Sequence, residues 1–314
     1  MELPNEHLIK TLKKLSKQYR SDSSLRWKKK ALDKAIYSLK HHDEEINSGK
    51  DALVLENIGK GIAKRIDEIL NTGTLAELID TETPEMKAIK EFKRITGVGN
   101  TRAKKWASSG ILTLDSLREA IASGTVKSTH HIDIGLKYLE DFEKRIPRSE
   151  IVEFQSLLDE IMFNLDDEII YNICGSYRRE NVDSGDIDIL ISHPDNKKYL
   201  TDLVKVLKDA DICIDDLTKK GNKKYMGVCK IPSCGIARRL DIRFIEYESY
   251  YAALLYFTGS KEFNVKVRKV AIEQGYSLSE YGLFKKDTEE IIILSSEEEL
   301  FEILGLDYVP PNLR

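Results

Sequence analysis

The strongest constraint on the fold is a short stretch near the middle of the chain in which acidic and branched apolar residues alternate. Asp186 and Asp188 are interleaved with Ile187 and Ile189, and the run continues to Ser192, with the two-residue period of a β-strand. Residues two apart on a strand face the same side, about 7 Å from one another at Cα. The stretch therefore predicts a strand with two carboxylates on one face and a hydrophobic core against the other.

The rest of the chain divides into a helical front part and a mixed back part. Leu8, Leu12 and Leu15 repeat at helical spacing, and helices are predicted as far as Pro147, which ends one helix while Ser149 can cap the next. Helices are predicted at residues 62–70, 101–108, 114–123, 135–142, 151–163 and 199–210, and strands at 169–174, 186–192, 225–231 and 239–245. The predicted class is α+β, with a helical domain followed by a sheet with helices.

Composition narrows the class of protein without naming it. The chain of 314 residues is 41% hydrophobic and 32% charged, which is typical of a folded chain of about two domains. It contains no apolar run of the ~20 residues that a membrane span needs, and residues 1–6 lack the layout of a signal peptide. We therefore expect an intracellular protein that does not enter a membrane.

Cysteine spacing and net charge give weaker indications. Cys174, Cys213, Cys229 and Cys234 form no CxxC pair, so reduced, structural cysteines are expected and a zinc site is not. The net charge of −4 argues weakly against a nucleic-acid partner. Basic clusters nevertheless lie at residues 26–30, 90–94 and 102–105, and local fields matter more than the sum of charges.

Two glycine-containing hairpins in the helical part suggest binding to a DNA backbone. Residues 57–61, which include Gly59 and Lys60, and residues 96–100, which include Gly97 and Gly99, each lie between two predicted helices. Glycine permits a tight turn and a close approach of another backbone, and the next helix points free N–H groups at an anion such as a phosphodiester. One hairpin alone would be read as an ordinary helix connection, but two flanked by Lys or Arg favour DNA-backbone binding.

A second constellation indicates phosphoryl transfer. Gly175 and Ser176 follow a predicted strand, Arg179 comes next, and Gly185 precedes the paired aspartates. The glycine turn and hydroxyl can hold a triphosphate, while the arginine can neutralise charge that grows in the transition state. A lone pair of aspartates on a strand would be read as a solvated edge, but this lead-in favours an active site.

The paired aspartates also predict a metal site. Crowded carboxylates repel unless a cation lies between them, and two Mg²⁺ ions about 4 Å apart suit in-line phosphoryl transfer. Asp241, in a strand-like segment, is the candidate for the third ligand and for the general base acting on a 3′-hydroxyl. Asp186, Asp188 and Asp241 are therefore the predicted catalytic and metal-binding residues.

These segments together resemble the family X DNA polymerases, the family that includes DNA polymerases beta and lambda. The resemblance rests on GSYRRENVDSGDIDILISHP from Gly175, KYMGVC from Lys224, RRLDIRFI from Arg238 and YFTGSKEFN from Tyr256, and runs from about Leu8 to Tyr308. It implies an N-terminal DNA-binding domain at residues 1–82, fingers at 83–148, a palm at 149–248 and a C-terminal thumb-like subdomain at 249–314. The implied function is template-directed filling of short gaps in DNA repair, in base excision repair or end joining, by a protein that acts as a monomer and, by analogy, in the nucleus.

The resemblance also implies substrate contacts. It adds Arg145, Tyr256, Phe257, Gly259, Lys261 and Asn264 to the residues that bind the dNTP, with the Tyr256–Gly259 segment excluding a ribose 2′-hydroxyl. DNA contacts are expected from Gly59, Lys60, Gly97, Gly99, Arg268, Lys28, Arg65, Tyr281 and Lys224. The implied partners are gapped or nicked DNA with a 5′-phosphate and a dNTP. The implied cofactors are two Mg²⁺ ions, replaceable by Mn²⁺, and a monovalent cation at the hairpins.

Three positions depart from the family pattern. Arg65 occupies the place of the lysine that forms a Schiff base with a 5′-deoxyribose phosphate, and arginine stays protonated and cannot act as that nucleophile. We therefore expect the lyase activity to be absent or weak, with 5′-phosphate binding retained through Lys28, Lys60 and Arg65. Glu180 replaces a usual glycine, and Lys261 replaces an aspartate near the nucleotide.

Two other functions remain open from the sequence. A template-independent or RNA-directed nucleotidyltransferase is disfavoured by the segment around Tyr256 and by the short loop at residues 232–237. A non-catalytic DNA-binding scaffold is disfavoured because it would have no reason to keep repelling carboxylates together.

Overall fold

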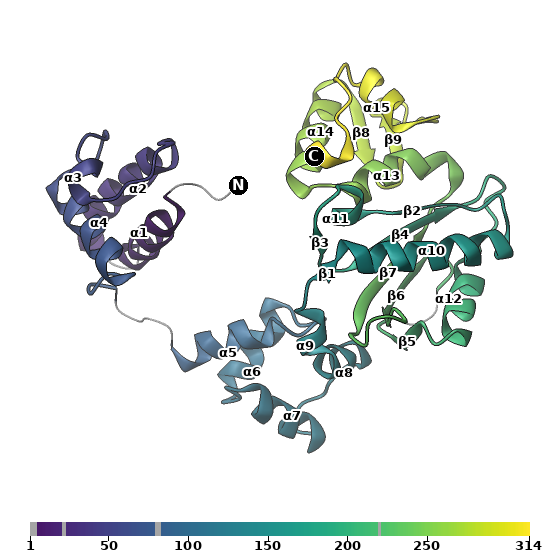
Figure 1. The fold of residues 1–314 in the computed structure, drawn as a ribbon, viewed down its shortest axis with the longest axis horizontal. Helices are drawn as coiled ribbons and strands as arrows, with labels where there is room; N and C mark the ends of the chain where they lie inside the picture. Colours follow the sequence, from purple (N-terminus) through teal and green to yellow (C-terminus); the bar gives the residue numbers. More distant parts are fainter. Residues whose placement is uncertain (1–4, 21–22, 79–82, 219–220) are drawn as a thin grey trace. The chain divides into compact units, whose positions relative to one another are not determined.

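The computed structural model describes residues 5–20, 23–78, 83–218 and 221–314. The chain forms two compact units, Met1–Met86 and Lys87–Arg314, which appear in Figure 1 and are considered separately below. The predicted boundary between residues 82 and 83 adjoins residues 79–82, which lie outside the described residues. Within the described residues, no helix has both the length and the apolar character needed to cross a bilayer.

The first unit is a small helical domain. Its helices are α1 (Glu6–Tyr19), α2 (Arg26–Lys40), α3 (Gly49–Ala52) and α4 (Lys60–Thr72). The predicted helical period is confirmed, because Leu8, Leu12 and Leu15 are buried against apolar residues of α2 and α4. Helix α4, predicted at residues 62–70, is two residues longer at each end and stops at Gly73, which takes the left-handed conformation with φ +76°.

The second unit begins with a helical subdomain. It contains α5 (Pro84–Phe92), whose first three residues fall in the first unit, followed by α6 (Asn100–Ser108), α7 (Leu114–Ala122), α8 (His130–Lys137) and α9 (Leu139–Phe142). Phe92 and Trp106 pack edge to face at 5.7 Å between ring centroids in its core. The single helix predicted at residues 135–142 is wrong in its bounds: two helices lie there, the first begins at His130, and they meet at Tyr138.

A five-stranded sheet follows, in the order β2 (Ile170–Ile173), β4 (Ile187–Ser192), β7 (Arg238–Phe244), β6 (Lys224–Cys229) and β5 (Cys213–Asp216). Strands β4 and β7 are parallel, and the other neighbours are antiparallel. Helices α10 (Arg148–Leu165) and α12 (Leu200–Asp209) bury the apolar side of the sheet, where Ile187 and Ile189 point as predicted. The opposite side carries the polar residues of β4 and β7, together with the buried Leu190.

The start of α10 differs from the prediction. Ser149 does not cap this helix, which begins at Arg148 with Pro147 in the N-cap position, two residues before the predicted cap. The two-residue strand β1 (Ile146–Pro147) pairs with β3 (Asp183–Ser184), and the backbone N–H of Arg148 donates to Val182 O at 3.0 Å. The first free N–H of the helix is thus satisfied by a neighbouring loop, so no side-chain cap is needed.

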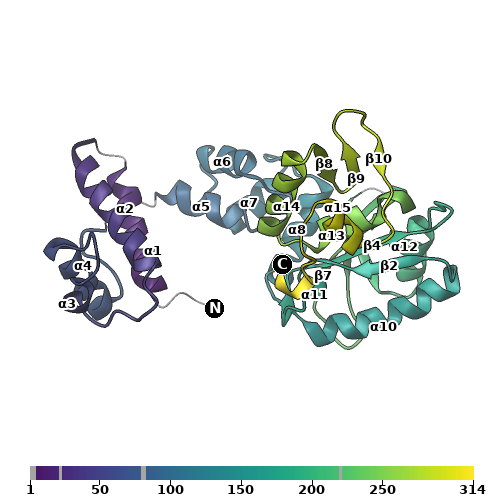
Figure 2. The ribbon, with the colours of Figure 1, turned by 90° about the horizontal axis from the view of Figure 1, so that it is seen from above.

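The C-terminal part is built around a helix that is buried on several sides. Helix α13 (Tyr250–Thr258) places Ala253 and Leu254 against the five-stranded sheet, while Ala252 and Leu255 join a second core. That second core is formed with α14 (Lys261–Glu273), α15 (Glu297–Ile303) and a sheet of β8 (Tyr276–Ser279), β9 (Gly282–Lys285) and β10 (Ile291–Ile292). Figures 1 and 2 show α13 between the large and the small sheet.

Candidate active site

Three carboxylates meet where β4 and β7 run side by side. The parallel register places Asp188 directly beside Asp241, and Asp186 lies immediately before β4. One carboxylate oxygen of each residue lies within 4.8 Å of the others. The two-residue period of one strand brings Asp186 and Asp188 to one face, and the pairing of two strands 53 residues apart in the chain adds Asp241.

The electrostatics of this cluster favour a bound cation. Burial, followed by the charges of Asp186 and Asp241, raises the pKa of Asp188 to about 7. Burial also raises the pKa of Asp241, although the nearby Arg239 guanidinium opposes the shift. Arg239 lies 2.6 Å from Asp186 and 3.6 Å from Asp241, yet Asp241 Oδ1 is buried without a hydrogen-bond partner. The carboxylate set therefore fits a hard divalent cation with oxygen ligands.

A tight turn presses against the carboxylates. The four-residue helix α11 (Gly175–Arg178) follows β2, and Gly175 has φ +58°. A Cβ at this glycine would lie 2.7 Å from Asp188 Oδ2, so only glycine permits so close an approach. Ser176 Oγ donates to Ser184 Oγ at 2.8 Å, which ties the turn to β3.

The next predicted nucleotide-binding residues extend from this turn. Arg179 donates to Thr258 O, and its guanidinium lies 3.3 Å from where a Cβ of Gly259 would be. A Cβ at Gly185 would lie 3.0 Å from Arg145 Nη1. The structure therefore brings the α11 turn to the end of α13.

Arg145 lies immediately before β1, and its Nη2 forms an ion pair with Asp183 Oδ1 at 2.7 Å. This ion pair spans the short β1–β3 sheet and orients the guanidinium beside Gly185.

The end of α13 and the start of α14 form the far wall of the site. The rings of Tyr256 and Phe257 meet at 5.1 Å in an edge contact, and both are only half-buried, so neither is a plain core residue. Asn264 Nδ2 donates to Tyr256 O at 2.7 Å, while its Oδ1 is buried without a partner. The Arg268 guanidinium lies 4.8 Å over the Tyr256 ring, and Lys261 is the exposed first residue of α14.

Two cations at the site were missed from the sequence. Arg239 and Arg243 lie on the same face of β7 as Asp241, at the two-residue spacing that could have revealed them. Arg243 lies 5.6 Å over the Phe257 ring and lines a small cleft with Lys224, Asp188 and Asp241. Lys224, expected among the DNA contacts, therefore lies beside the carboxylates.

The two hairpins have similar backbones at the start of the second helix. They differ in the residue that adopts the left-handed conformation, which the sequence predicts to be a glycine in both. Gly59 and Gly99 are the N-cap residues of α4 and α6, with ψ of 173° and 172°, and no atom lies within 4 Å of where their Cβ would be. The left-handed residue is Gly97 in the second hairpin, with φ +88°, but Asn57 in the first, with φ +66°. Asparagine tolerates this conformation better than most residues, so glycine is not the residue that turns the first hairpin.

In the first unit, Arg65 is held by its own domain. Its guanidinium forms two hydrogen bonds with Glu77, one of them 2.9 Å long, and a third with Tyr19 Oη at 3.4 Å. The hydrogen bonds from Arg65 are the main cause that lowers the pKa of Glu77, and the charge of Lys28 makes a smaller contribution in the same direction. Tyr281, in the second unit, is an exposed residue of the β8–β9 turn.

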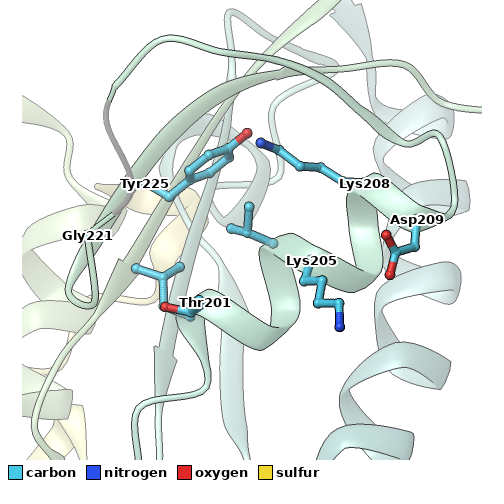
Figure 3. Close-up of a pocket in the computed structure, with 8 residues that line it drawn as sticks. Thr201, Lys205, Lys208, Asp209, Gly221 and Tyr225 are labelled. Carbon is cyan, nitrogen blue, oxygen red and sulfur yellow. The ribbon is translucent and has the colours of Figure 1, made fainter.

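Two other features do not belong to this site. Asp166, Glu168 and His193 form a second acidic cluster, but His193 Nδ1 accepts the Asp195 N–H at 3.0 Å. Its proton is therefore on Nε2, which leaves no lone pair there for a metal. Figure 3 shows a cleft between α12 and Tyr225, which is lined by Lys205 and Lys208 and by none of the three aspartates. Lys208 is paired with Asp216 at 2.6 Å.

Comparison with known proteins covers nearly the whole chain. Family models of the DNA polymerase beta palm and the DNA polymerase beta thumb match residues 145–247 and 253–314. A helix-hairpin-helix domain model matches residues 3–75, and the fingers domain of DNA polymerase lambda matches residues 90–143.

Three named DNA polymerases are similar to the chain over nearly all of its length. The chain is 32% identical to DNA polymerase lambda of Rattus norvegicus over 99% of its length, and 32% identical to DNA polymerase lambda of Arabidopsis thaliana over 90%. It is 27% identical to DNA polymerase IV of Saccharomyces cerevisiae over 99%. The chain spans 56% of the length of each lambda relative and 66% of the yeast one. With palm, thumb, fingers and hairpin domain matched in the expected order around the carboxylate cluster, the chain belongs to the family X DNA polymerases and resembles DNA polymerases beta and lambda.

Proposed function

We propose that this chain is a template-directed DNA polymerase that fills short gaps during DNA repair, adding a dNMP to a primer 3′-hydroxyl. The observation that carries the proposal is the meeting of Asp186, Asp188 and Asp241 beside the Gly175 turn. We further propose that it acts as a monomer on gapped DNA with a 5′-phosphate. The names of the relatives and of the matched domains support DNA and a dNTP as the substrates.

Mg²⁺ is the cofactor that suits the cluster best, because all three candidate ligands offer hard oxygen atoms. Held by the three aspartates, two such ions would supply activation of the 3′-hydroxyl and neutralisation of the phosphate charge. The unpartnered Oδ1 of Asp241 and the raised pKa of Asp188 are the features that a cation would relieve.

The protein's own groups would position the nucleotide. The backbone of the Gly175–Ser176 turn and the Arg179 and Arg145 guanidinium groups would hold the triphosphate and stabilise the charge that develops on it. The Tyr256–Gly259 backbone would exclude a 2′-hydroxyl, and the free Oδ1 and the oriented amide of Asn264 would face the base. Arg268, stacked on Tyr256, would reach the template strand.

The test is insertion into a one-nucleotide gapped duplex with each dNTP in turn, with Mg²⁺, by wild type and by Asp241→Asn. Loss of one ligand should remove several kcal/mol of transition-state stabilisation, roughly a thousandfold in rate. Asp209→Asn, an exposed carboxylate on α12, is the matched control and should insert normally. Tight DNA binding without insertion by wild type would indicate a scaffold. Insertion that ignores the template, or that accepts NTPs equally, would indicate the other nucleotidyltransferase class.

We also propose that the 5′-deoxyribose phosphate lyase activity is absent or weak. Arg65 stands at the position of the nucleophilic lysine, and Glu77 raises the pKa of its already basic guanidinium, so it cannot supply a free amine. Borohydride treatment with an incised abasic duplex should give no covalent adduct. An adduct that forms with wild type and disappears in Lys64→Arg or Lys60→Arg would instead assign the amine to that lysine.

A further inference from the structure

A basic face on the first helix is not used by the proposed function. Lys13, Lys17 and Arg20 are exposed along one side of α1 or just after it, opposite the buried Leu8, Leu12 and Leu15. Together with Lys29 of α2 they line a groove of about 380 Å³, whose other residues are Ser16, Asp33 and Ile36. We call this surface the α1 groove.

The charges of the α1 groove are largely uncompensated. Within the described residues, Lys13, Lys17 and Arg20 form no ion pair, whereas Asp33 is already held by Lys29 and by Ser16. Like charges three or four residues apart on a helix repel one another and destabilise the helix. The arrangement therefore costs stability in the free protein, and a bound polyanion would remove that cost.

Basic residues are concentrated in the part of the chain that forms the α1 groove. Residues 10–40 contain eleven lysines and arginines but two aspartates, whereas residues 43–86 contain eleven acidic residues and four basic ones. The whole chain has a net charge of −4, so its average charge would repel a polyanion. Cations gathered on two packed helices create a positive local field despite that average.

The spacing along the helix suits a nucleic-acid strand. Seven residues separate Lys13 from Arg20, about 10 Å along a helix axis, which corresponds to about three nucleotides of a strand at ~3.4 Å each. Lysine and arginine contacts of this kind hold phosphates without reading sequence. The groove also lies on α1 and α2, whereas the hairpin of the same unit joins α3 to α4, so the two surfaces are formed by different elements.

We propose that the α1 groove is a second phosphate-binding surface, which holds a DNA strand in addition to the segment held by the hairpin. The choice of DNA as the polyanion rests on the proposed function. The groove would lengthen the DNA footprint and strengthen binding without taking part in chemistry, because every candidate catalytic residue lies in the other unit.

The test is the salt dependence of binding to a fluorescently labelled gapped duplex, measured by anisotropy on the full chain. Lys13→Ala/Lys17→Ala should lower the slope of log K against log salt by about two, since each phosphate contact contributes about 0.9. Between ~50 and ~200 mM salt, wild type should therefore lose about tenfold more affinity than the variant does. The control Lys198→Ala/Lys205→Ala changes the same charge at exposed positions of the palm and should keep the wild-type slope.

An unchanged slope in Lys13→Ala/Lys17→Ala, or an equal change in the control, would overturn the inference. Loss of binding to phosphatidylserine vesicles with an unchanged DNA slope would also overturn it and assign the groove to a membrane surface. Single-nucleotide insertion at saturating DNA separates the two proposals. The Lys13→Ala/Lys17→Ala variant should insert a nucleotide at the wild-type rate. If wild type fails to insert a nucleotide while the variant still shows the lower salt slope, only the polymerase proposal is contradicted.

Discussion

At the scale of single residues, the carboxylate cluster destabilises the metal-free protein. Asp188 is buried beside two other acids, and its pKa of about 7 lies far above the ordinary value of 3.8. A carboxyl with a raised native pKa binds its proton more tightly in the folded state than in the unfolded state. Folding stability therefore falls as pH rises from 3.8 to about 7, and the full cost is present above that range.

Asp188→Asn should consequently stabilise the metal-free protein while abolishing insertion. In EDTA at pH 8, its free energy of unfolding by urea should exceed that of wild type by on the order of a few kcal/mol. The gain should shrink as the pH is lowered from 7 towards 3.8, since Asp188 then carries its proton in the native state. A difference that does not change with pH would show that the gain arises from something other than ionisation.

At the scale of elements, each hairpin depends on one residue in the left-handed conformation. Gly97 has φ +88°, and a Cβ there would lie 2.8 Å from the ring of His131 on α8. Gly110, after α6, has nearly the same φ of +87°, but nothing lies within 4 Å of its Cβ position. The pair therefore separates the conformational cost of losing glycine from the cost of a clash.

Gly97→Ala should destabilise the protein more than Gly110→Ala, by roughly 1–3 kcal/mol from overpacking. The free energy of unfolding by urea should be measured for both variants. The smaller decrease in Gly110→Ala gives the cost of placing alanine in the left-handed conformation without a clash. His131→Ala in the Gly97→Ala background should recover part of the difference, because it removes the contacting ring. Equal losses in the two glycine variants would mean that α8 moves aside without cost.

At the scale of the whole molecule, the two units have separate cores and separate candidate tasks. Met1–Met86 buries its own apolar cluster and carries the first hairpin, Arg65 and the α1 groove, while Lys87–Arg314 holds all the candidate catalytic and nucleotide-binding residues. Chemistry and part of the DNA binding should therefore be separable.

The fragment of residues 83–314, which keeps the whole of α5, should fold when expressed alone and insert a nucleotide with a kcat near that of the full chain. Its KM for gapped DNA should rise roughly tenfold or more, because several phosphate contacts are lost. Steady-state kinetics on gaps with and without a 5′-phosphate would measure this, and the fragment should no longer distinguish the two substrates. Loss of kcat at saturating DNA would mean that the first unit contributes to the catalytic step.

Much of the fold and of the candidate site follows from local sequence. The alternation around Ile187 and Ile189 predicts the strand and its buried face, and the helical spacing of Leu8, Leu12 and Leu15 predicts α1 and its buried side. The break near Pro147 predicts the start of a new helix but misplaces its cap, because the partner of the Arg148 N–H is Val182, 34 residues away along the chain. Apolar residues repeat every two residues in a strand and every 3.6 residues in a helix because one side of the element is buried, so these patterns can be recognised from the sequence alone.

Other features depend on contacts between distant segments, which no local pattern records. The parallel pairing of β4 with β7 sets Asp241 beside Asp188, and the same pairing brings Arg239 to Asp186. The engagement of Arg65 by Glu77 and Tyr19 likewise needs α1, α4 and the segment after α4 to pack together. The sequence by itself determined the strands that carry the acids, the identity of the acids and their family pattern, but no predicted strand covers β5 or the small sheet of β8, β9 and β10. Only the tertiary structure decided which charges meet, because burial and pairing set the pKa values and ion pairs of the site.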